Sequence, residues 1–292
     1  MELKDLMGKK KVIILDGAMG TYISSLSFKE KTPEIANIIK PDLVKRIHKE
    51  YVEAGADIIL TNTFGANRAR LKVKGLVDKI EEINKNGAEI AKEVKREYPG
   101  ILIAGDIGPS GDFLQPYGNL KKEDAEMIYT EQGEILKSSG VDFILLETFS
   151  DLEELKIAYR SIKENVNICV VPCMTFTSKN YRTIMGQGIE DFIMWAEEEG
   201  EKIIGINCGM DSKEMKGIVR KLEGKDIILW VKPNAGMPEL SEGKIIYPES
   251  PEEFVENCVE MVKMGIKFIG GCCGTNPEYI KLLKNRIYNE AC

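Results

Sequence analysis

The sequence predicts an α/β fold of the (β/α)₈ or TIM-barrel class, formed as a single domain by residues 1–292. Eight short runs rich in Ile and Val recur along the chain, and a helical segment follows each of them. The apolar runs are continuous rather than alternating, which is typical of parallel strands buried on both faces. A doubly wound open sheet is the alternative that the same alternation of strands and helices allows.

The elements follow one another in strict order. We expect strands at 12–15, 57–60, 101–104, 142–146, 168–171, 203–206, 227–231 and 267–269. We expect helices at 41–54, 76–97, 121–139, 152–164, 189–199, 212–222, 251–264 and 277–288. Three of these helices start at a proline, which is tolerated in the first turn: Pro41, Pro251 and Pro277. Longer excursions at 112–119 and 238–247 follow the third and seventh strands and should lie on the face that carries the active site.

The composition excludes several classes of protein. The net charge of -7 and the lack of a basic face argue against a nucleic-acid partner. No apolar run approaches the roughly 18 residues that a membrane span needs. The start of the chain shows no leader peptide, so we expect a cytoplasmic protein. The single histidine, His48, is interpreted as an ordinary surface or helix residue, so catalysis should work without a histidine base.

Three of the seven cysteines fall at predicted strand ends, where barrels of this class carry their catalytic groups. Cys208 follows the sixth strand, and Cys272 and Cys273 follow the eighth. These two strands flank the seventh, so their ends lie about 10 Å apart, a gap that inward-reaching side chains can close onto one ion. Three glycines frame the doublet and allow the turn that brings both sulfurs to one metal: Gly270, Gly271 and Gly274.

Three thiolates without a histidine suit Zn²⁺, and three protein ligands leave a fourth position for substrate. Such an ion carries excess negative charge, so it is a poor Lewis acid for splitting water. It is well suited to hold a substrate thiol as the thiolate, because coordination removes the thiol proton. The residues therefore favour alkyl transfer to sulfur over hydrolysis. The other four cysteines are interpreted as small buried apolar residues: Cys169, Cys173, Cys258 and Cys292.

The strand-end motifs resemble those of the homocysteine S-methyltransferases from about residue 10 to 288. The matching motifs are DGAMGT at 16–21, TNTF at 61–64, GDIGP at 105–109, ETFSD at 147–151, GINC at 205–208, PNAG at 233–236 and GGCCGT at 270–275. The segment at 271–278 is most similar to the homocysteine-binding module of cobalamin-dependent methionine synthase. Betaine-dependent relatives usually carry an aromatic residue in place of Thr275, and S-methylmethionine-dependent relatives an arginine in place of Gly274. The chain stops one helix after the doublet, so it resembles the homocysteine half of a split enzyme or an excised module.

The resemblance implies roles for individual residues. Cys208, Cys272 and Cys273 would bind Zn²⁺ and act in catalysis. Glu147 would bind the amino-acid part of L-homocysteine together with three backbone positions: Gly17, Ala18 and Met19. A structural salt bridge is the alternative for Glu147.

Three further strand-end side chains are weaker candidates. Asp16 would either orient the substrate or cap the turn before Thr21. We hypothesise that the side-chain oxygen of Asn234 fills the fourth zinc position when substrate is absent. Asn207 and Asp106 are expected to stabilise turns.

The implied activity is transfer of a methyl group to L-homocysteine, which gives L-methionine. The implied donor is a methylcorrinoid (methylcobalamin) on a partner protein, with 5-methyltetrahydrofolate upstream. Direct transfer from S-methylmethionine or betaine is the first alternative. A zinc-binding barrel with a structural or regulatory role and no turnover is an alternative of another class.

Overall fold

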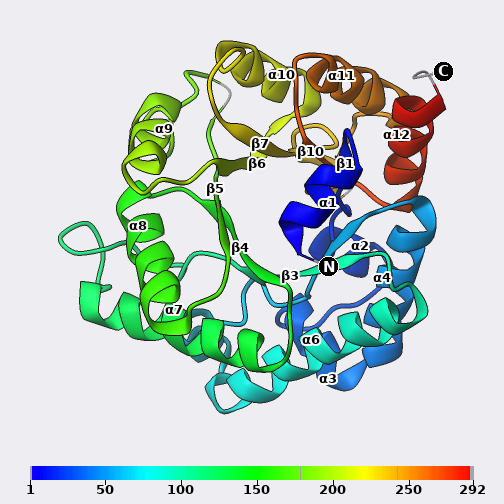
Figure 1. The fold of residues 1–292 in the computed structure, drawn as a ribbon. Helices are drawn as coiled ribbons and strands as arrows, with labels where there is room; N and C mark the ends of the chain where they lie inside the picture. The colour runs from blue at the N-terminus through cyan, green and yellow to red at the C-terminus, as the bar shows by residue number, and fades with distance from the viewer. Residues whose placement is uncertain (1, 178, 242, 290–292) are drawn as a thin grey trace.

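The computed structural model describes residues 2–177, 179–241 and 243–289, and its strands form a barrel inside a ring of helices (Figure 1). Within these ranges, eight parallel strands pair in the order β1-β10-β7-β6-β5-β4-β3-β2. A bridge between Leu15 and Ile58 joins β1 to β2, and the N–H of Asp57 donates to the C=O of Ile14 at 2.7 Å. The ring is therefore closed. The (β/α)₈ prediction is confirmed, and the open-sheet alternative is wrong.

The ends of the barrel strands lie within five residues of the predicted ends. They are β1 (Ile13–Ile14), β2 (Ile58–Leu60), β3 (Leu102–Ile107), β4 (Phe143–Phe149), β5 (Val170–Met174), β6 (Ile203–Asp211), β7 (Ile228–Asn234) and β10 (Phe268–Ile269). The excursion predicted at 238–247 contains an antiparallel hairpin of β8 (Glu239–Ser241) and β9 (Lys244–Ile246). Several strands run past their apolar segments into polar residues, and those extensions carry the candidate site.

The eight predicted helices form the outer ring. They are α4 (Pro41–Ala54), α6 (Ile80–Glu97), α7 (Lys122–Ser138), α8 (Leu152–Ser161), α9 (Ile189–Glu198), α10 (Ser212–Lys221), α11 (Pro251–Lys263) and α12 (Pro277–Asn289). The helix predicted at 76–97 starts with a 3₁₀ turn, η2 (Val77–Lys79), and α8 continues into a π-helical turn, η3 (Ile162–Val166). Short helices that the sequence pattern did not predict are α1 (Leu3–Lys9), α2 (Gly20–Ser25), η1 (Pro33–Ile35), α3 (Ala36–Ile39) and α5 (Arg68–Lys74).

The strands bury both faces, which explains their continuous apolar runs. Alternate residues such as Leu102 and Ala104 of β3 and Phe143 and Leu145 of β4 fill the inside of the barrel. The residue between the first two, Ile103, belongs to the layer that packs against the helices. Because strand side chains alternate between the two faces, every second residue after an inner apolar residue also points into the barrel.

One end of the barrel is covered by α1, which lies across it in Figure 1. Leu3 and Leu6 of this helix pack on the inner apolar layer. Lys267, just before β10, donates to the C=O of Met7 at 2.9 Å and ties α1 to the amino end of that strand. The amino-terminal end of the barrel is thus closed by apolar contacts, and the polar chemistry gathers at the opposite end.

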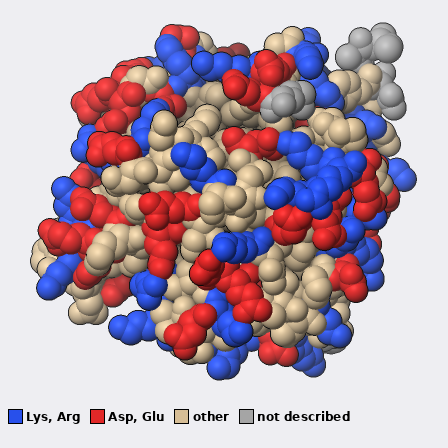
Figure 2. Space-filling model, turned by 60° about the horizontal axis from the view of Figure 1, so that its bottom comes forward, with Lys and Arg blue, Asp and Glu red and all other residues tan. Residues whose placement is uncertain are grey.

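The surface is charged but mixed in sign. On the face seen in Figure 2, Lys and Arg side chains are interspersed with Asp and Glu, without a broad basic field. Among the described residues, no helix combines the length and the apolar character that crossing a bilayer requires.

Two interpretations of single residues need correction. His48 does lie in helix α4, but its side chain is 0% exposed and its two ring nitrogens have no hydrogen-bond partner. Helix α4 packs on α3, α6 and α12, so more than one of its sides is covered. Cys169 is exposed rather than buried, because it precedes β5 instead of lying within it. Cys173 and Cys258 are buried as predicted, and Cys292 lies outside the described residues.

Candidate metal and substrate site

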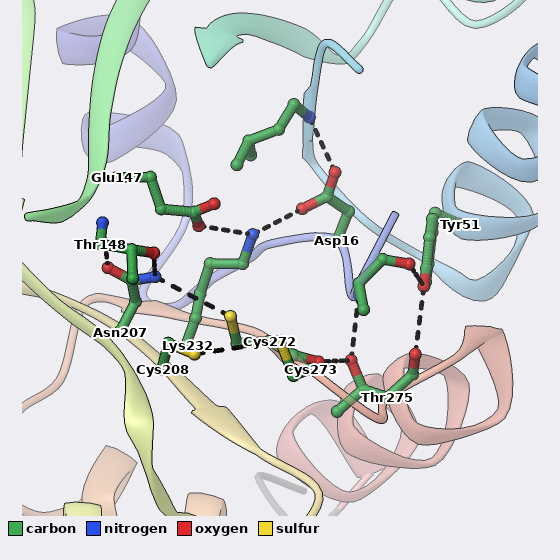
Figure 3. A network of polar contacts seen from close by, with 12 residues as sticks. Asp16, Tyr51, Glu147, Thr148, Asn207, Cys208, Lys232, Cys272, Cys273 and Thr275 are labelled. Atoms are coloured by element: carbon green, nitrogen blue, oxygen red, sulfur yellow. Dashed lines mark hydrogen bonds and ion pairs between the residues drawn. The ribbon is translucent and has the colours of Figure 1, made fainter. Parts of the chain in front are cut away.

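The structure brings the three strand-end sulfurs together. The Sγ atoms of Cys208, Cys272 and Cys273 lie within 4.8 Å of one another, and those of Cys208 and Cys273 are 3.9 Å apart. Figure 3 shows the three side chains converging from the ends of β6 and β10. Three thiols at this spacing are able to ligate one metal ion.

Cys208 reaches the cluster because β6 changes direction there. Its backbone is left-handed with φ 57°, and the pairing of β6 with β7 shifts register between Asn207 and Asp211. A left-handed conformation costs a non-glycine residue about 1–2 kcal/mol, so the surrounding contacts must hold it. The side-chain amide of Asn207 provides such contacts, donating to Thr148 Oγ1 at 2.6 Å and to Cys272 Sγ at 3.8 Å. Asn207 thus links the ends of β4 and β6 to one of the sulfurs.

The doublet is held against the end of β7. The N–H of Cys272 donates to the C=O of Pro233 at 2.7 Å, and the N–H of Ala235 donates to the C=O of Cys273 at 2.9 Å. The chain then turns at Gly274, which has φ 85°. A Cβ at this position would lie 2.3 Å from Cγ of Tyr247, so both the backbone angle and the close approach require glycine.

Negative charge concentrates on Cys273. Hydrogen bonds from the thiols of Cys208 and Cys272 lower the pKa of Cys273 to about 3. Hydrogen bonds to Cys272 and to Cys273 raise the pKa of Cys208 well above its usual range. A hydrogen bond from the Tyr247 hydroxyl also lowers the pKa of Cys273. The cluster therefore favours a thiolate, the form of cysteine that binds metal.

Beside the sulfurs, the strands turn charged side chains into the barrel. Trp230 belongs to the inner apolar layer, and Lys232 is the next residue of β7 that points the same way. By the same alternation, Asp106 on β3 and Glu147 on β4 point inward, because each stands two residues after an inner apolar residue. All three are buried.

Lys232 lies between two carboxylates (Figure 3). Its Nζ is 3.1 Å from Oδ1 of Asp16 and 3.3 Å from Oε1 of Glu147. The second contact is an ion pair without hydrogen-bond alignment, since Oε1 of Glu147 has no hydrogen-bond partner. Burial raises the pKa of Glu147 to about 7 although Lys232 opposes the shift. Burial acts to lower the pKa of Lys232, but attraction by Asp16 and Glu147 outweighs it, and that pKa is raised.

Some of the polar groups after β1 that were predicted to contact the substrate form hydrogen bonds within the protein. Asp16 accepts a hydrogen bond from the N–H of Leu60 at 2.7 Å, so it ties β1 to β2 and does not cap the turn before Thr21. The N–H of Ala18 donates to Thr275 Oγ1 at 3.1 Å, and the C=O of Ala18 accepts from the Tyr51 hydroxyl at 2.6 Å. These bonds join the first strand end to the segment after the cysteine doublet.

Besides Oε1 of Glu147, two further buried oxygens near the strand ends have no hydrogen-bond partner among the described residues: Oδ1 of Asp106 and Oδ1 of Asn234. Burial, followed by repulsion from Glu147, raises the pKa of Asp106 well above its usual range. A buried acceptor without a partner is costly, by about 1–3 kcal/mol, so both oxygens indicate places where a ligand or ion could supply the missing contact.

The comparisons with known proteins agree with the motifs. The family model described as homocysteine S-methyltransferase matches residues 13–287. The chain belongs to this family. Among curated relatives, the methionine synthases of Mycobacterium leprae and Mycobacterium tuberculosis are 32% and 31% identical over 93% and 99% of the chain. The chain spans only 24% and 25% of their lengths.

Solved structures support the barrel of this family member. The homocysteine methyltransferase MmuM from Escherichia coli, in its metallated form, superposes with a TM-score of 0.81. The match covers 97% of this chain and 99% of that one at 21% identity. A methyltransferase from Methanosarcina mazei matches with a TM-score of 0.63 at 12% identity, over 99% and 98% of the two chains. At these identities the likeness concerns the fold.

Sequence reasoning missed two residues of this homocysteine S-methyltransferase site. Lys232 lies between the predicted seventh strand and the PNAG motif and was assigned no role, although it stands two residues after an inward-facing tryptophan. Assigning each strand residue to a face would have identified it. Tyr247, which packs over Gly274, is brought to the sulfurs by the β8–β9 hairpin, and no local pattern indicates that.

Proposed function

We propose that this chain transfers a methyl group to the thiol of L-homocysteine and so forms L-methionine. The observation that carries the proposal is the sulfur cluster of Cys208, Cys272 and Cys273, within 4.8 Å, at the polar end of the barrel. Membership of the homocysteine S-methyltransferase family and the relatives named methionine synthase support it.

The donor set fits Zn²⁺. Three thiol ligands suit this ion, and within the described residues the cluster holds three such ligands, which leaves a fourth position for substrate. When bound, the ion would lower the pKa of the substrate thiol so that its sulfur reacts as the thiolate. The contacts of Asn207 with Cys272 and of Tyr247 with Cys273 would orient the two sulfurs from outside the ligand set.

The charged side chains would bind the other end of the substrate. Glu147 and Asp16 offer carboxylate oxygens for the α-ammonium group. Because both backbone groups of Ala18 are engaged within the protein, the backbone groups of Gly17 and Met19 would provide the contacts expected from that segment. In the reaction, the homocysteine sulfur forms a bond to the methyl carbon. The donor's bond to that carbon breaks, its electron pair leaves with the donor, and the thiol proton goes to solvent.

We further propose that the donor is a methylcorrinoid on a partner protein, supplied by 5-methyltetrahydrofolate. The relatives named methionine synthase are about four times as long as this chain, which leaves room in them for modules that handle the donor. Gly274 is also packed against Tyr247, where the arginine usual in S-methylmethionine-dependent relatives would not fit.

A methyl-transfer assay tests the reaction. We expect the purified chain to form methionine from homocysteine and free methylcobalamin, because the sulfur site alone should activate the thiol. Removal of zinc by a chelator should reduce the rate to that of a protein-free control, and added Zn²⁺ should restore it. Full activity after complete zinc removal would refute the mechanism. Turnover with S-methylmethionine or betaine alone would show that this compound, and not a methylcorrinoid, is the donor.

The role of Asn234 is tested separately. We propose that its buried and unpartnered Oδ1 completes the zinc coordination when homocysteine is absent. X-ray absorption of the zinc-loaded Asn234→Ala variant should then show a changed oxygen or nitrogen contribution relative to wild type. With homocysteine bound, the two spectra should coincide, which serves as the internal control. Identical spectra without homocysteine would remove the idea.

A further inference from the structure

We propose that Lys232 is a positioning residue for substrate selection: it holds Asp16 and Glu147 in the arrangement that accepts the α-ammonium of an amino-acid thiol. This inference rests on the proposed function and adds Lys232 to the residues that carry it out. The ammonium of Lys232 is within 3.3 Å of both carboxylates, which come from β4 and from the end of β1. Lys232 therefore connects strand ends that lie on different sides of the barrel (Figure 3).

The burial of Lys232 makes this contact significant. Its side chain is 3% exposed, and those of Asp16 and Glu147 are 4% and 10% exposed. A lysine in such surroundings has no water to solvate it, so its charge depends on the two carboxylates. The carboxylates depend on Lys232 in the same way. Removing the lysine would leave them as repelling neighbours free to move or to take up protons.

The charges nevertheless do not balance. A single lysine faces the two carboxylates of Asp16 and Glu147 from the described elements, and Asp106 is a third acidic side chain in the same group whose raised pKa keeps it protonated near neutral pH. The other titratable groups that interact with these residues are thiols and a phenol, which add no positive charge: Cys173, Cys272, Cys273 and Tyr51. Oδ1 of Asp106 has no hydrogen-bond donor, and Oε1 of Glu147 has only its ion pair with Lys232. The group therefore has acceptors and negative charge to bind one further cation.

A substrate α-ammonium supplies that cation. It provides three N–H donors, and the carboxylates of Asp16 and Glu147 together with the unpartnered Oδ1 of Asp106 offer acceptors for them. In this arrangement Lys232 contacts the carboxylates from one side, and the substrate ammonium contacts them from another. Lys232 thereby favours thiols that carry an amino group over those that do not.

Two thiols that differ only in the amino group make the test. L-Homocysteine and 4-mercaptobutanoate share the thiol, the chain length and the carboxylate. KM and kcat for both, and their Kd from calorimetry on the zinc-loaded protein, would be measured for wild type and Lys232→Met. The control is Lys267→Met, which removes a lysine at the opposite end of the barrel, where it binds the C=O of Met7.

We expect Lys232→Met to raise KM and Kd for homocysteine by at least about tenfold, the effect of losing a charged hydrogen bond, with a smaller change in kcat. KM and Kd for 4-mercaptobutanoate should stay within about threefold of their wild-type values, so that discrimination between the two thiols falls. Lys267→Met should keep the wild-type discrimination. In a Glu147→Gln background, Lys232→Met should have less effect than in wild type, because its action passes through that carboxylate.

Three results would overturn the inference. An equal rise in KM and Kd for both thiols would show a general structural role for Lys232. A lower KM and Kd for homocysteine in Lys232→Met would show that the lysine occupies the ammonium position. Unchanged discrimination would show that it takes no part in selection. If wild type methylates neither thiol with any donor, the proposed function fails, while the Kd values still decide the role of Lys232.

Discussion

Replacing Cys208 by serine is expected to abolish methyl transfer and to weaken zinc binding by more than about 100-fold, since losing a partner of a ligand alone costs 10–100-fold. The hydroxyl has nearly the same volume as the thiol but is a much poorer ligand for this ion. Cys208 is the one sulfur of the cluster that comes from β6, so the remaining pair would bind from a single strand end. Zinc content after dialysis and the rate of methionine formation measure the two effects.

The matched control for Cys208→Ser is Cys169→Ser. Cys169 is exposed, precedes β5 and does not belong to the sulfur cluster. This control should keep wild-type zinc content and rate, and both variants should keep the wild-type circular dichroism. A Cys208→Ser protein that retains one tightly bound zinc and the wild-type rate would contradict the assignment of the site.

The stability of the protein is expected to fall on acidification because of His48, by up to roughly 3 kcal/mol between about pH 7 and pH 4. Burial lowers the pKa of His48 from 6.5 to about 4 in the folded state. Between these values the unfolded chain binds a proton that the folded chain does not, so the free energy of unfolding decreases as the pH falls. Above pH 6.5 the residue is neutral in both states, and its contribution disappears.

Replacement of His48 by leucine isolates this effect. Leucine has a similar volume and no proton to bind, and the unpartnered ring nitrogens are removed as well. The difference in unfolding free energy between variant and wild type, measured by urea titration at several pH values, should grow toward pH 4. The carboxylates are the same in both proteins and the chain has a single histidine, so the difference between the two curves reports the titration of His48. Curves that stay parallel from pH 7 to pH 4 would show that His48 is solvated or paired.

The barrel was predictable because its signal is local and repeated. Runs such as 142–146 are apolar on both faces, and Pro41, Pro251 and Pro277 mark helix starts that the structure retains. The short helices α1 and α2 were missed since they occupy a few turns at the barrel ends, where no apolar period develops. The burial of His48 was missed because helix α4 is covered on more than the one side that its own pattern indicates.

The sequence by itself determined which residues stand at the strand ends, because in parallel strands the order of the chain assigns every carboxyl end to one rim of the barrel. It therefore indicated the cysteine trio, Glu147 and Asn234 before any coordinates. Only the tertiary structure decided that the sulfurs meet within 4.8 Å and that Lys232 lies between Asp16 and Glu147. These contacts join residues as much as 216 positions apart, and they depend on barrel closure and on the left-handed turn at Cys208. No local preference of the chain encodes either of them.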